Sequence, residues 1–373
     1  MKPKFRKWGK NIFLAFTILI VVLYLLVCLV PFINAGTFWF ISLIGLVFPF
    51  LFFIMVFLLL FWAIKRSKWF FLILVALLLG WQQVSAAFGI HFFKNEFRVE
   101  KDDNTLRILS WNVFRWDEQN KKAKGGVSYR NLMLDFIGGQ NADVLCLQEF
   151  FEPYKYDYFQ SNINVLAEMG YKYHFFYPTA SVWNGELKFG MAIFSRYPLA
   201  DSGQVSFGQT PHSEGICYTD VKMNNNNIVR IFSTHMESSR MGQYGYFAFD
   251  NGETGSIDAT KQGIRTLRQA YVYRSIQADI VRDEINKSPY PVVMCGNLGD
   301  IPNSHAYFTV RGNLQDAFIK KGAGFGGTFS FISPTLRIDY IFADKHFKVQ
   351  QFDRPKIPYS DHYPIIADIT LTN

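Results

Sequence analysis

Three long apolar stretches near the N-terminus set the first condition on how this chain folds. They cover roughly residues 12–34, 38–64 and 69–90, and each reaches the ~20 residues that a helix needs to cross the hydrocarbon core of a bilayer. Three in succession, without a convincing small-residue cleavage site, are not typical of a signal peptide. The sequence therefore predicts a membrane anchor of three transmembrane helices over residues 1–92, although Gln82 and Gln83 interrupt the third stretch.

The basic residues of this anchor predict its orientation. Five precede the first stretch and three lie between the second and the third, at 65–68, whereas the turn at 34–37 carries no charge. Short loops rich in Lys and Arg stay in the cytoplasm. With three crossings of a plasma or inner membrane, we expect a cytoplasmic N-terminus and a periplasmic or extracellular domain after about residue 92.

The net charge of +8 belongs to the anchor and not to the rest of the chain. Residues 1–100 hold ten Lys and Arg but two Asp and Glu, and the remaining residues hold 28 of each. A neutral domain makes nucleic acid a less favoured partner, because nucleic-acid binding relies on several Lys and Arg contacts to phosphates. The four cysteines show no paired framework, and we expect them to be buried small residues.

After a polar linker over 93–104, residues 105–373 alternate short β-rich runs with amphipathic segments. This pattern predicts an α/β domain with a two-sheet core covered by helices. The expected helices cover 127–139, 155–169 and 261–287. The expected strands are Leu106–Trp111, Val144–Leu147, Tyr173–Tyr177, Met191–Ser195, Ile216–Met223, Val229–Ser233, Val292–Cys295, Arg337–Phe342 and Ile365–Thr370.

Polar residues able to bind a metal or a phosphate finish six strand-like runs. One such residue alone carries little weight, since a carboxylate after a buried strand is more often a cap or a surface residue. Six together predict one site at the strand ends. The residues are Asn112, Glu149, His235, Asn297, Asp339 and the pair Asp361–His362.

Seven sequence blocks around these residues resemble, in order, the signatures of the endonuclease/exonuclease/phosphatase superfamily, the deoxyribonuclease-like metal-dependent phosphoesterases. The resemblance covers about 105–373 and leaves the apolar stretches outside it. It implies a β-sandwich flanked by helices in four layers, α/β/β/α, and a hydrolase that uses Mg²⁺, with Mn²⁺ as an alternative. The blocks are SWNVF at 110–114, LCLQEF at 145–150, FGMAIFSRYP at 189–198, FSTHMES at 232–238, VVMCGNLGDIPNS at 292–304, RIDYIF at 337–342 and YSDHYPI at 359–365.

The resemblance also implies a metal site. It makes Glu149 the main metal ligand, with Asn112 as its companion and Asp361 on the metal side. Carboxylate and amide oxygens are hard ligands, which suit a Mg²⁺ ion that keeps several of its waters.

A phosphate-binding role is implied for two histidines. By resemblance, His362 and His235 contact oxygens of the scissile phosphate, and Asp339 orients His362. A carboxylate beside a histidine holds the ring in one tautomer, which fits this assignment.

One block departs from the family's pattern. The family usually carries GDFN followed by Asp, any residue and Pro, where the first Asp activates or orients water and the Asn steadies the phosphoryl group. Here residues 296–302 read GNLGDIP, so Asn297 replaces the Asp and Gly299 replaces the Asn. An amide cannot act as a general base, and glycine offers no side chain. Asp300 lies three residues beyond the strand end, and we expect it to point elsewhere.

Two functions therefore stay open. The first is a membrane-anchored, extracytoplasmic phosphoesterase, with a phosphodiesterase preferred. The second is a catalytically impaired pseudoenzyme that binds a phosphorylated ligand. Membrane tethering and loop aromatics favour a phospholipid or sphingolipid headgroup as substrate, because amphipathic rings favour the membrane interface. These aromatics are Tyr154, Tyr156, Tyr158, Phe159, Tyr244, Tyr246 and Phe247.

Overall fold

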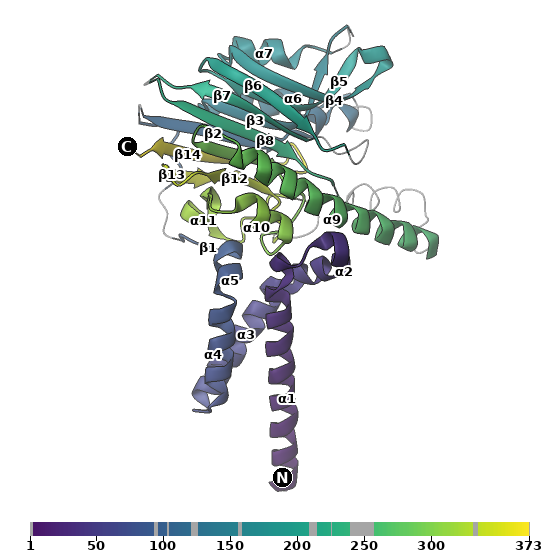
Figure 1. Ribbon diagram of the computed structural model, residues 1–373, viewed down its shortest axis with the longest axis vertical. Coiled ribbons are helices and arrows are strands. Elements are labelled where there is room, and N and C mark those ends of the chain that lie inside the picture. The colour runs from purple at the N-terminus through teal and green to yellow at the C-terminus, as the bar shows by residue number, and fades with distance from the viewer. Residues whose placement is uncertain are drawn as a thin grey trace.

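A helical stalk and an α/β domain make up the protein in the computed structural model (Figure 1). The structure describes residues 3–92, 96–102, 104–120, 126–155, 159–208, 215–224, 226–238, 257–330 and 335–372. Five of the loop aromatics named above lie outside the described residues: Tyr156, Tyr158, Tyr244, Tyr246 and Phe247.

The stalk contains two helical segments that are long and apolar enough to cross a membrane, Trp8–Phe32 and Phe38–Ile64. The third predicted span is a helix pair bent by 61°, so the described part of the chain offers two spans, or three if the bent pair counts as one. Of the three predicted transmembrane helices, the first two are therefore single helical segments able to cross a membrane, and the third is a broken pair that counts as a span only when its two helices are taken together. The stalk helices are α1 (Pro3–Cys28), η1 (Val30–Phe32), α2 (Ala35–Ile44), η2 (Gly45–Val47), α3 (Phe48–Ile64), α4 (Trp69–Leu79) and α5 (Trp81–Ala87).

The bend between α4 and α5 lies at Gly80, where the chain comes very close to α1. A Cβ atom on Gly80 would lie 2.2 Å from Tyr24 Oη and 2.7 Å from Cys28 Sγ. Just beyond the bend, Gln83 Nε2 donates to the Cys28 carbonyl at 2.8 Å. A glycine and a polar side chain are thus both needed at this crossing, and together they interrupt the apolar stretch.

Two six-stranded sheets form the core of the domain, in the orders β13-β14-β2-β3-β5-β4 and β10-β12-β9-β8-β7-β6. The pairs β2–β3 and β8–β9 are parallel, and the other neighbours are antiparallel. The first sheet contains β2 (Thr105–Asn112), β3 (Val144–Pro153), β4 (Tyr173–Val182), β5 (Leu187–Ser195), β13 (Phe347–Asp353) and β14 (Ile365–Leu371). The second contains β6 (Leu199–Ser206), β7 (Gly215–Lys222), β8 (Ile228–His235), β9 (Val292–Asn297), β10 (Gln315–Asp316) and β12 (Asp339–Ala343).

Helices cover the outer faces of both sheets. Met133 and Leu166, from α6 and α7, pack on the outer face of the first sheet. Val281 and Tyr307, from α9 and α10, pack on that of the second. The layer order is thus α/β/β/α, as the resemblance implies. The helices are α6 (Arg130–Gly139), α7 (Asn162–Glu168), α9 (Ile257–Asn286), α10 (His305–Arg311) and α11 (Ala317–Lys321), with the short turns η3 (Phe114–Asn120) and η4 (Trp183–Gly185).

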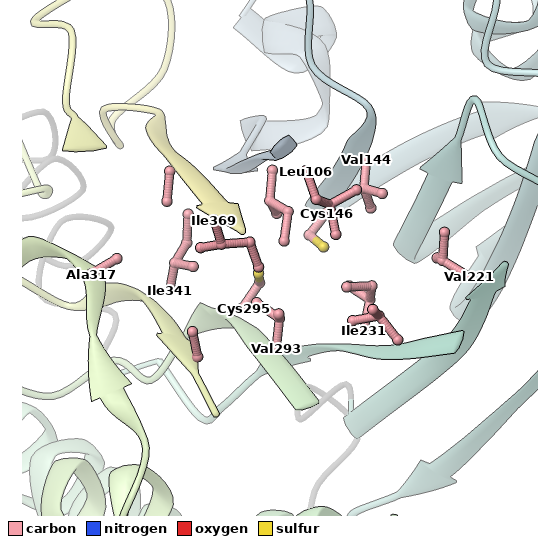
Figure 2. Packing of buried hydrophobic residues seen from close by; sticks show 14 of the residues in the cluster. Leu106, Val144, Cys146, Val221, Ile231, Val293, Cys295, Ala317, Ile341 and Ile369 are labelled. Atoms are coloured by element: carbon pink, nitrogen blue, oxygen red, sulfur yellow. The ribbon is translucent and has the colours of Figure 1, made fainter. Parts of the chain in front are cut away.

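The space between the sheets is filled by apolar side chains from both (Figure 2). Cys146 of β3 and Cys295 of β9 lie in this layer, and all four cysteines of the chain are buried and free. The expectation that they act as small buried residues is confirmed.

The sequence pattern missed the edge strand β6, and it also missed β13 at an end of the other sheet. Side chains of β6 alternate irregularly between partly and fully exposed positions, so they leave no clear period-two apolar pattern. Two predicted boundaries also differ from the structure. The strand predicted to begin at Arg337 begins at Asp339, and the helix predicted over 155–169 begins at Asn162.

Candidate active site

Strand direction brings distant parts of the sequence to one edge of the sandwich. Asn112 ends β2, His235 ends β8 and Asn297 ends β9, and His235 lies opposite Asn297 in the β8–β9 register. Asp339 does not end a strand as the pattern predicted, but begins β12. Because β12 runs antiparallel to β9, Asp339 pairs with Asn297 and reaches the same edge.

Glu149 occupies an irregular position inside β3, which continues to Pro153 instead of ending at Glu149 as predicted. The β3–β5 register shifts between Leu147 and Phe150, and Glu149 has a φ of +48°. A non-glycine residue at positive φ costs on the order of 1–3 kcal/mol and is often found at functional sites. The bulge brings the carboxylate to Asn112, whose Nδ2 donates to Glu149 Oε1 at 3.0 Å.

The charges around Glu149 keep it ionised. Burial acts to raise the pKa of Glu149, but His235 and Arg115, together with the Asn112 hydrogen bond, lower it below its usual value. Arg115 Nε lies 3.8 Å from Glu149 Oε2. The Glu149 side chain is partly exposed.

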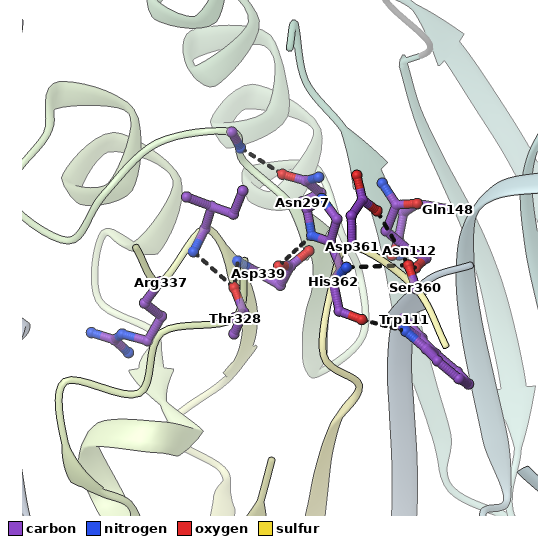
Figure 3. Close-up of polar contacts among 12 residues, drawn as sticks. Trp111, Asn112, Gln148, Asn297, Thr328, Arg337, Asp339, Ser360, Asp361 and His362 are labelled. Atoms are coloured by element: carbon purple, nitrogen blue, oxygen red, sulfur yellow. Dashed lines mark hydrogen bonds and ion pairs between the residues drawn. The ribbon is translucent and has the colours of Figure 1, made fainter. Parts of the chain in front are cut away.

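His362 forms a buried pair with Asp339, with 2.8 Å between Nδ1 and Oδ2 (Figure 3). Burial lowers the pKa of His362, but the carboxylates of Asp339 and Asp361 outweigh it and raise that pKa to about 9. The imidazole is therefore protonated at neutral pH. Since Nδ1 is engaged by Asp339, Nε2 is the nitrogen that can donate to a ligand.

Backbone contacts fix His362 beside the end of β2. Ser360 Oγ donates to the Asn112 carbonyl at 2.8 Å and accepts from the His362 backbone N–H at 3.1 Å. Trp111 Nε1 donates to the His362 carbonyl at 2.9 Å (Figure 3). These bonds join the segment before β14 to β2, so Asn112 and His362 hold a common position despite their distance in sequence.

Asp361 completes the cluster from the same segment. Burial raises the pKa of Asp361, and the neighbouring charges of Glu149 and Asp339 act in the same direction, against His362. The carboxylates of Glu149 and Asp361 thus repel each other within the same cluster. A cation between them would relieve the repulsion.

The donor set suits a hydrated Mg²⁺ ion. Among the described residues, no group of three or more His, Cys, Asp or Glu could hold a metal ion. Glu149 and Asp361 nevertheless carry hard carboxylate oxygens, and Mg²⁺ commonly takes one or two protein carboxylates while water and substrate complete its shell. Asn112 turns its Nδ2 toward Glu149, and its Oδ1 accepts from the Phe114 N–H at 3.0 Å. The residue types are therefore compatible with a hydrated ion on one or two carboxylates, and not with an ion held by protein ligands alone.

The altered block forms a tight turn at the end of β9. Asn297 Oδ1 accepts a hydrogen bond from the Gly299 N–H at 2.7 Å, and Gly299 has a φ of +62°. A Cβ atom on Gly299 would lie 3.0 Å from the Glu237 carbonyl oxygen and 3.1 Å from Arg274 Nη1. This turn uses the Asn297 amide as a backbone cap and leaves little room for a side chain at 299.

Asp300 faces the helix behind the sheet. Its Oδ1 accepts from the Ile301 N–H at 2.9 Å, and its Oδ2 lies 3.8 Å from Arg274 Nε. Burial raises the pKa of Asp300, and Arg274 opposes this effect. Its contacts lie on the α9 side of the turn, in line with the expectation that Asp300 points elsewhere.

Sequence reasoning missed Arg115, Gln148 and Arg274. Arg115 reaches Glu149 through a turn in which four consecutive residues, 114–117, have φ between 46° and 59°. Gln148 Nε2 donates to Ser233 Oγ at 3.1 Å and so links the two sheets below the site. Arg274 Nη1 donates to the Gly299 carbonyl. None of the three lies in a position that hydropathy or a strand-end pattern marks.

Comparison with known proteins separates the chain into the same two parts. Residues 109–362 match the endonuclease/exonuclease/phosphatase family, and residues 10–87 match a domain of unknown function (DUF8431). No curated protein matches the chain with significance.

Solved structures share the fold of the α/β domain. An endonuclease/exonuclease/phosphatase from Beutenbergia cavernae DSM 12333 is similar with a TM-score of 0.53 and 19% identity, over 72% of each chain. The human Nocturnin catalytic domain with bound sulfate has a TM-score of 0.51 and 20% identity, over 72% of this chain and 94% of its own. A mannosyl-6-phosphatase from Bacteroides thetaiotaomicron VPI-5482 has a TM-score of 0.50 and 17% identity, over 71% of this chain and 100% of its own. At these identities the likeness establishes the fold alone.

Proposed function

The chain belongs to the endonuclease/exonuclease/phosphatase family, whose members are phosphoric ester hydrolases, and on this premise we propose that it is a membrane-anchored, Mg²⁺-dependent phosphodiesterase. One observation carries the proposal. At a single edge of the sandwich, an ionised Glu149 lies near a protonated His362 that Asp339 holds by one nitrogen. An anion-stabilising cation beside a carboxylate metal ligand is what phosphoryl transfer requires.

Each residue has a defined task in this proposal. Glu149 and Asp361, with Asn112, would hold Mg²⁺, which would supply charge neutralisation for the phosphoryl oxygens. His362 Nε2 donates a hydrogen bond to a non-bridging phosphoryl oxygen. His235 stabilises the same group from the end of β8. Because these groups are held before substrate arrives, they stabilise charge as it develops without a further reorganisation cost.

Asn297 sets the expected speed of the reaction. Its amide can orient water but cannot accept a proton from it. Loss of general-base assistance typically costs about 10²–10⁴-fold in rate. The protein is accordingly a slow hydrolase in this proposal, with Asn297 acting as an orienting group.

The amide at Asn297 also supports a second candidate, a pseudoenzyme that binds a phosphorylated ligand without hydrolysing it. An uncharged Asn297 lessens the repulsion that an anionic phosphate meets at the site. The paired His362 and the metal ligands would still hold such a ligand.

The anchor supports a location outside the cytoplasm and a substrate at the bilayer surface. Basic residues at 2–10 and at 65–68 favour a cytoplasmic position for both the N-terminus and the loop after the second span, and the domain lies outside the cytoplasm when the bent α4–α5 pair makes a third crossing. A lipid headgroup, as in a phospholipid or sphingolipid, would reach a tethered site without leaving the membrane. C-terminal fusions to alkaline phosphatase and to green fluorescent protein test the location: phosphatase activity without fluorescence is expected, and the reverse result contradicts it.

A hydrolysis screen tests the function. The full chain in nanodiscs is incubated with Mg²⁺ and bis-p-nitrophenyl phosphate, p-nitrophenyl phosphate, sphingomyelin, glycerophospholipids, inositol phosphates or DNA. We expect Mg²⁺-dependent release of product that Glu149→Ala removes and that Glu168→Ala, at an exposed carboxylate of α7, leaves unchanged. Binding of inorganic phosphate without hydrolysis would favour the pseudoenzyme, and the absence of both would refute both candidates.

A further inference from the structure

The stalk meets the domain through side chains on both sides of the junction. In Figure 1, α2 and the upper end of α1 lie below α9 and α10, and α5 lies below α11. Asn303 Nδ2 donates to the Val27 carbonyl at 3.2 Å, and Ser275 Oγ donates to Asn34 Oδ1 at 2.8 Å. Both domain residues, Asn303 and Ser275, are 2% exposed. These are buried contacts, unlike those of a flexible tether.

The close approach at Gly45 shows how tightly the two parts pack. A Cβ atom on Gly45 would lie 2.8 Å from the Asn303 carbonyl oxygen and 3.6 Å from Ile301 Cδ1. A larger residue at 45 would therefore push the backbone of the domain away. The turn between α2 and α3 thus rests directly on the segment that follows Asn297.

A second set of contacts lies where the C-terminal part of the stalk, after α5, meets the domain. The short strands β1 (Gly89–Ile90) and β11 (Ala323–Gly324) pair antiparallel. Arg337 Nη2 donates to the Ala86 carbonyl, and Ala86 belongs to the apolar cluster under α9 and α10. The ring of Phe325 packs 5.1 Å from that of Phe88. The stalk is therefore continuous with the packing of the second sheet.

The contacted segment, residues 297–305, leads straight into the candidate site. Arg274, next to Ser275 on α9, donates to the Gly299 carbonyl. Tyr340 Oη donates to the Asp300 carbonyl at 2.9 Å. The turn that carries Asn297 is thus held by α9 and β12 at one end, and the same segment is held by the stalk at Asn303.

We propose that residues 27–45 of the stalk position the 297–305 segment, so that Asn303 and Ser275 act as positioning residues for Asn297. The structural half of this inference stands on the contacts above, and its catalytic half rests on the proposed function. A shift of about 1 Å in a reacting group can cost about 10²-fold in rate, so a partial loosening of the segment should be measurable as a loss of turnover.

Hydrogen exchange tests the structural half without any need for activity. The full chain in nanodiscs is compared with the double variant Asn303→Leu, Ser275→Ala and with Thr17→Ala. Thr17 is a matched control, because it is fully buried and accepts from Trp62 Nε1 at 3.2 Å within the stalk. We expect at least about tenfold faster exchange in peptides covering 297–305 of the double variant, with β2 and β3 still protected. Unchanged exchange there, or an equal effect of Thr17→Ala, overturns the proposal.

Kinetics with bis-p-nitrophenyl phosphate test the catalytic half. The double variant should lower kcat about tenfold and leave KM within about twofold, and Ser275→Thr, which keeps the hydroxyl donor, should retain wild-type turnover. Faster exchange with an unchanged kcat would show that the stalk holds the segment without positioning the site, which overturns this half. If the wild-type chain hydrolyses no ester, the proposed function fails, while the exchange data still decide whether the stalk holds the segment.

Discussion

The two sides of the candidate site differ in charge although they share one edge of the sandwich. On the ionic side lie the carboxyl groups of Glu149 and Asp361 and the His362–Asp339 pair. On the neutral side, the 297–299 turn presents an amide at Asn297 and a glycine at 299, neither of which carries charge. Under the proposed function, the ionic side would bind metal and phosphate, and the neutral side would provide little help with proton transfer.

The largest expected effect comes from removing the ionic side's metal ligand. Glu149→Ala deletes the carboxylate at the β3 bulge, and loss of the metal's charge stabilisation should lower turnover at least about 10³-fold. Initial rates with bis-p-nitrophenyl phosphate over a Mg²⁺ titration measure it, with Glu168→Ala as the control. Retained activity in Glu149→Ala would show that Glu149 is not the main metal ligand, and the proposed difference between the two sides of the site would then be wrong.

Restoring an acid on the neutral side is expected to have the next largest effect. Asn297→Asp keeps the acceptor for the Gly299 N–H and adds a base, so turnover should rise about 10²-fold. Adding Gly299→Asn should give little more, since a Cβ at 299 would crowd Glu237 and Arg274, although Asn tolerates positive φ. Family-like turnover in the native protein, unaltered by Asn297→Asp, would identify another base and contradict our assignment of the neutral side.

The His362–Asp339 pair predicts that the stability of the folded protein depends on pH, with an effect of intermediate size. The folded pKa of about 9 lies above the ordinary value, so the protonated form and the stability it adds are fully present below about pH 6.5 and are lost as pH rises through about 9. Asp339→Asn removes the carboxylate that raises this pKa most, and should lower it by at least about one unit. NMR titration of the histidines in metal-free protein with EDTA measures the shift. An unchanged His362 titration would show that the pair does not control the ring's charge.

The smallest effect is expected at the rim of the ionic side. Arg115 is about one-third exposed and lies 3.8 Å from Glu149, so solvent screens its charge. Arg115→Gln should raise KM for a phosphate diester about threefold and leave kcat within about twofold, a loss below about 1 kcal/mol. Arg115→Lys is the matched control for charge. A tenfold or larger fall in kcat with either variant would indicate that Arg115 contacts the reacting phosphate directly.

Apolar stretches and block order were sufficient to predict two apolar helices able to cross a membrane and the two-sheet sandwich covered by helices. These features depend on hydropathy and local residue type, which can be read directly from the sequence. They did not predict the 61° bend at Gly80, where the chain comes close to Tyr24 and Cys28 of α1, or the register shift at Glu149, which depends on the pairing of β3 with β5.

Only the tertiary structure decided how the candidate residues face one another. Asp339 reaches the site because β12 runs antiparallel to β9, and that pairing joins strands whose connection the sequence does not reveal. In the same way, Arg274 and Asn303 acquire their roles from contacts with residues 25 and 276 positions away. The sequence by itself determined which chemical groups the protein carries. Long-range packing determined which of them meet, because contacts between distant segments exist only once the sheets and the stalk have come together.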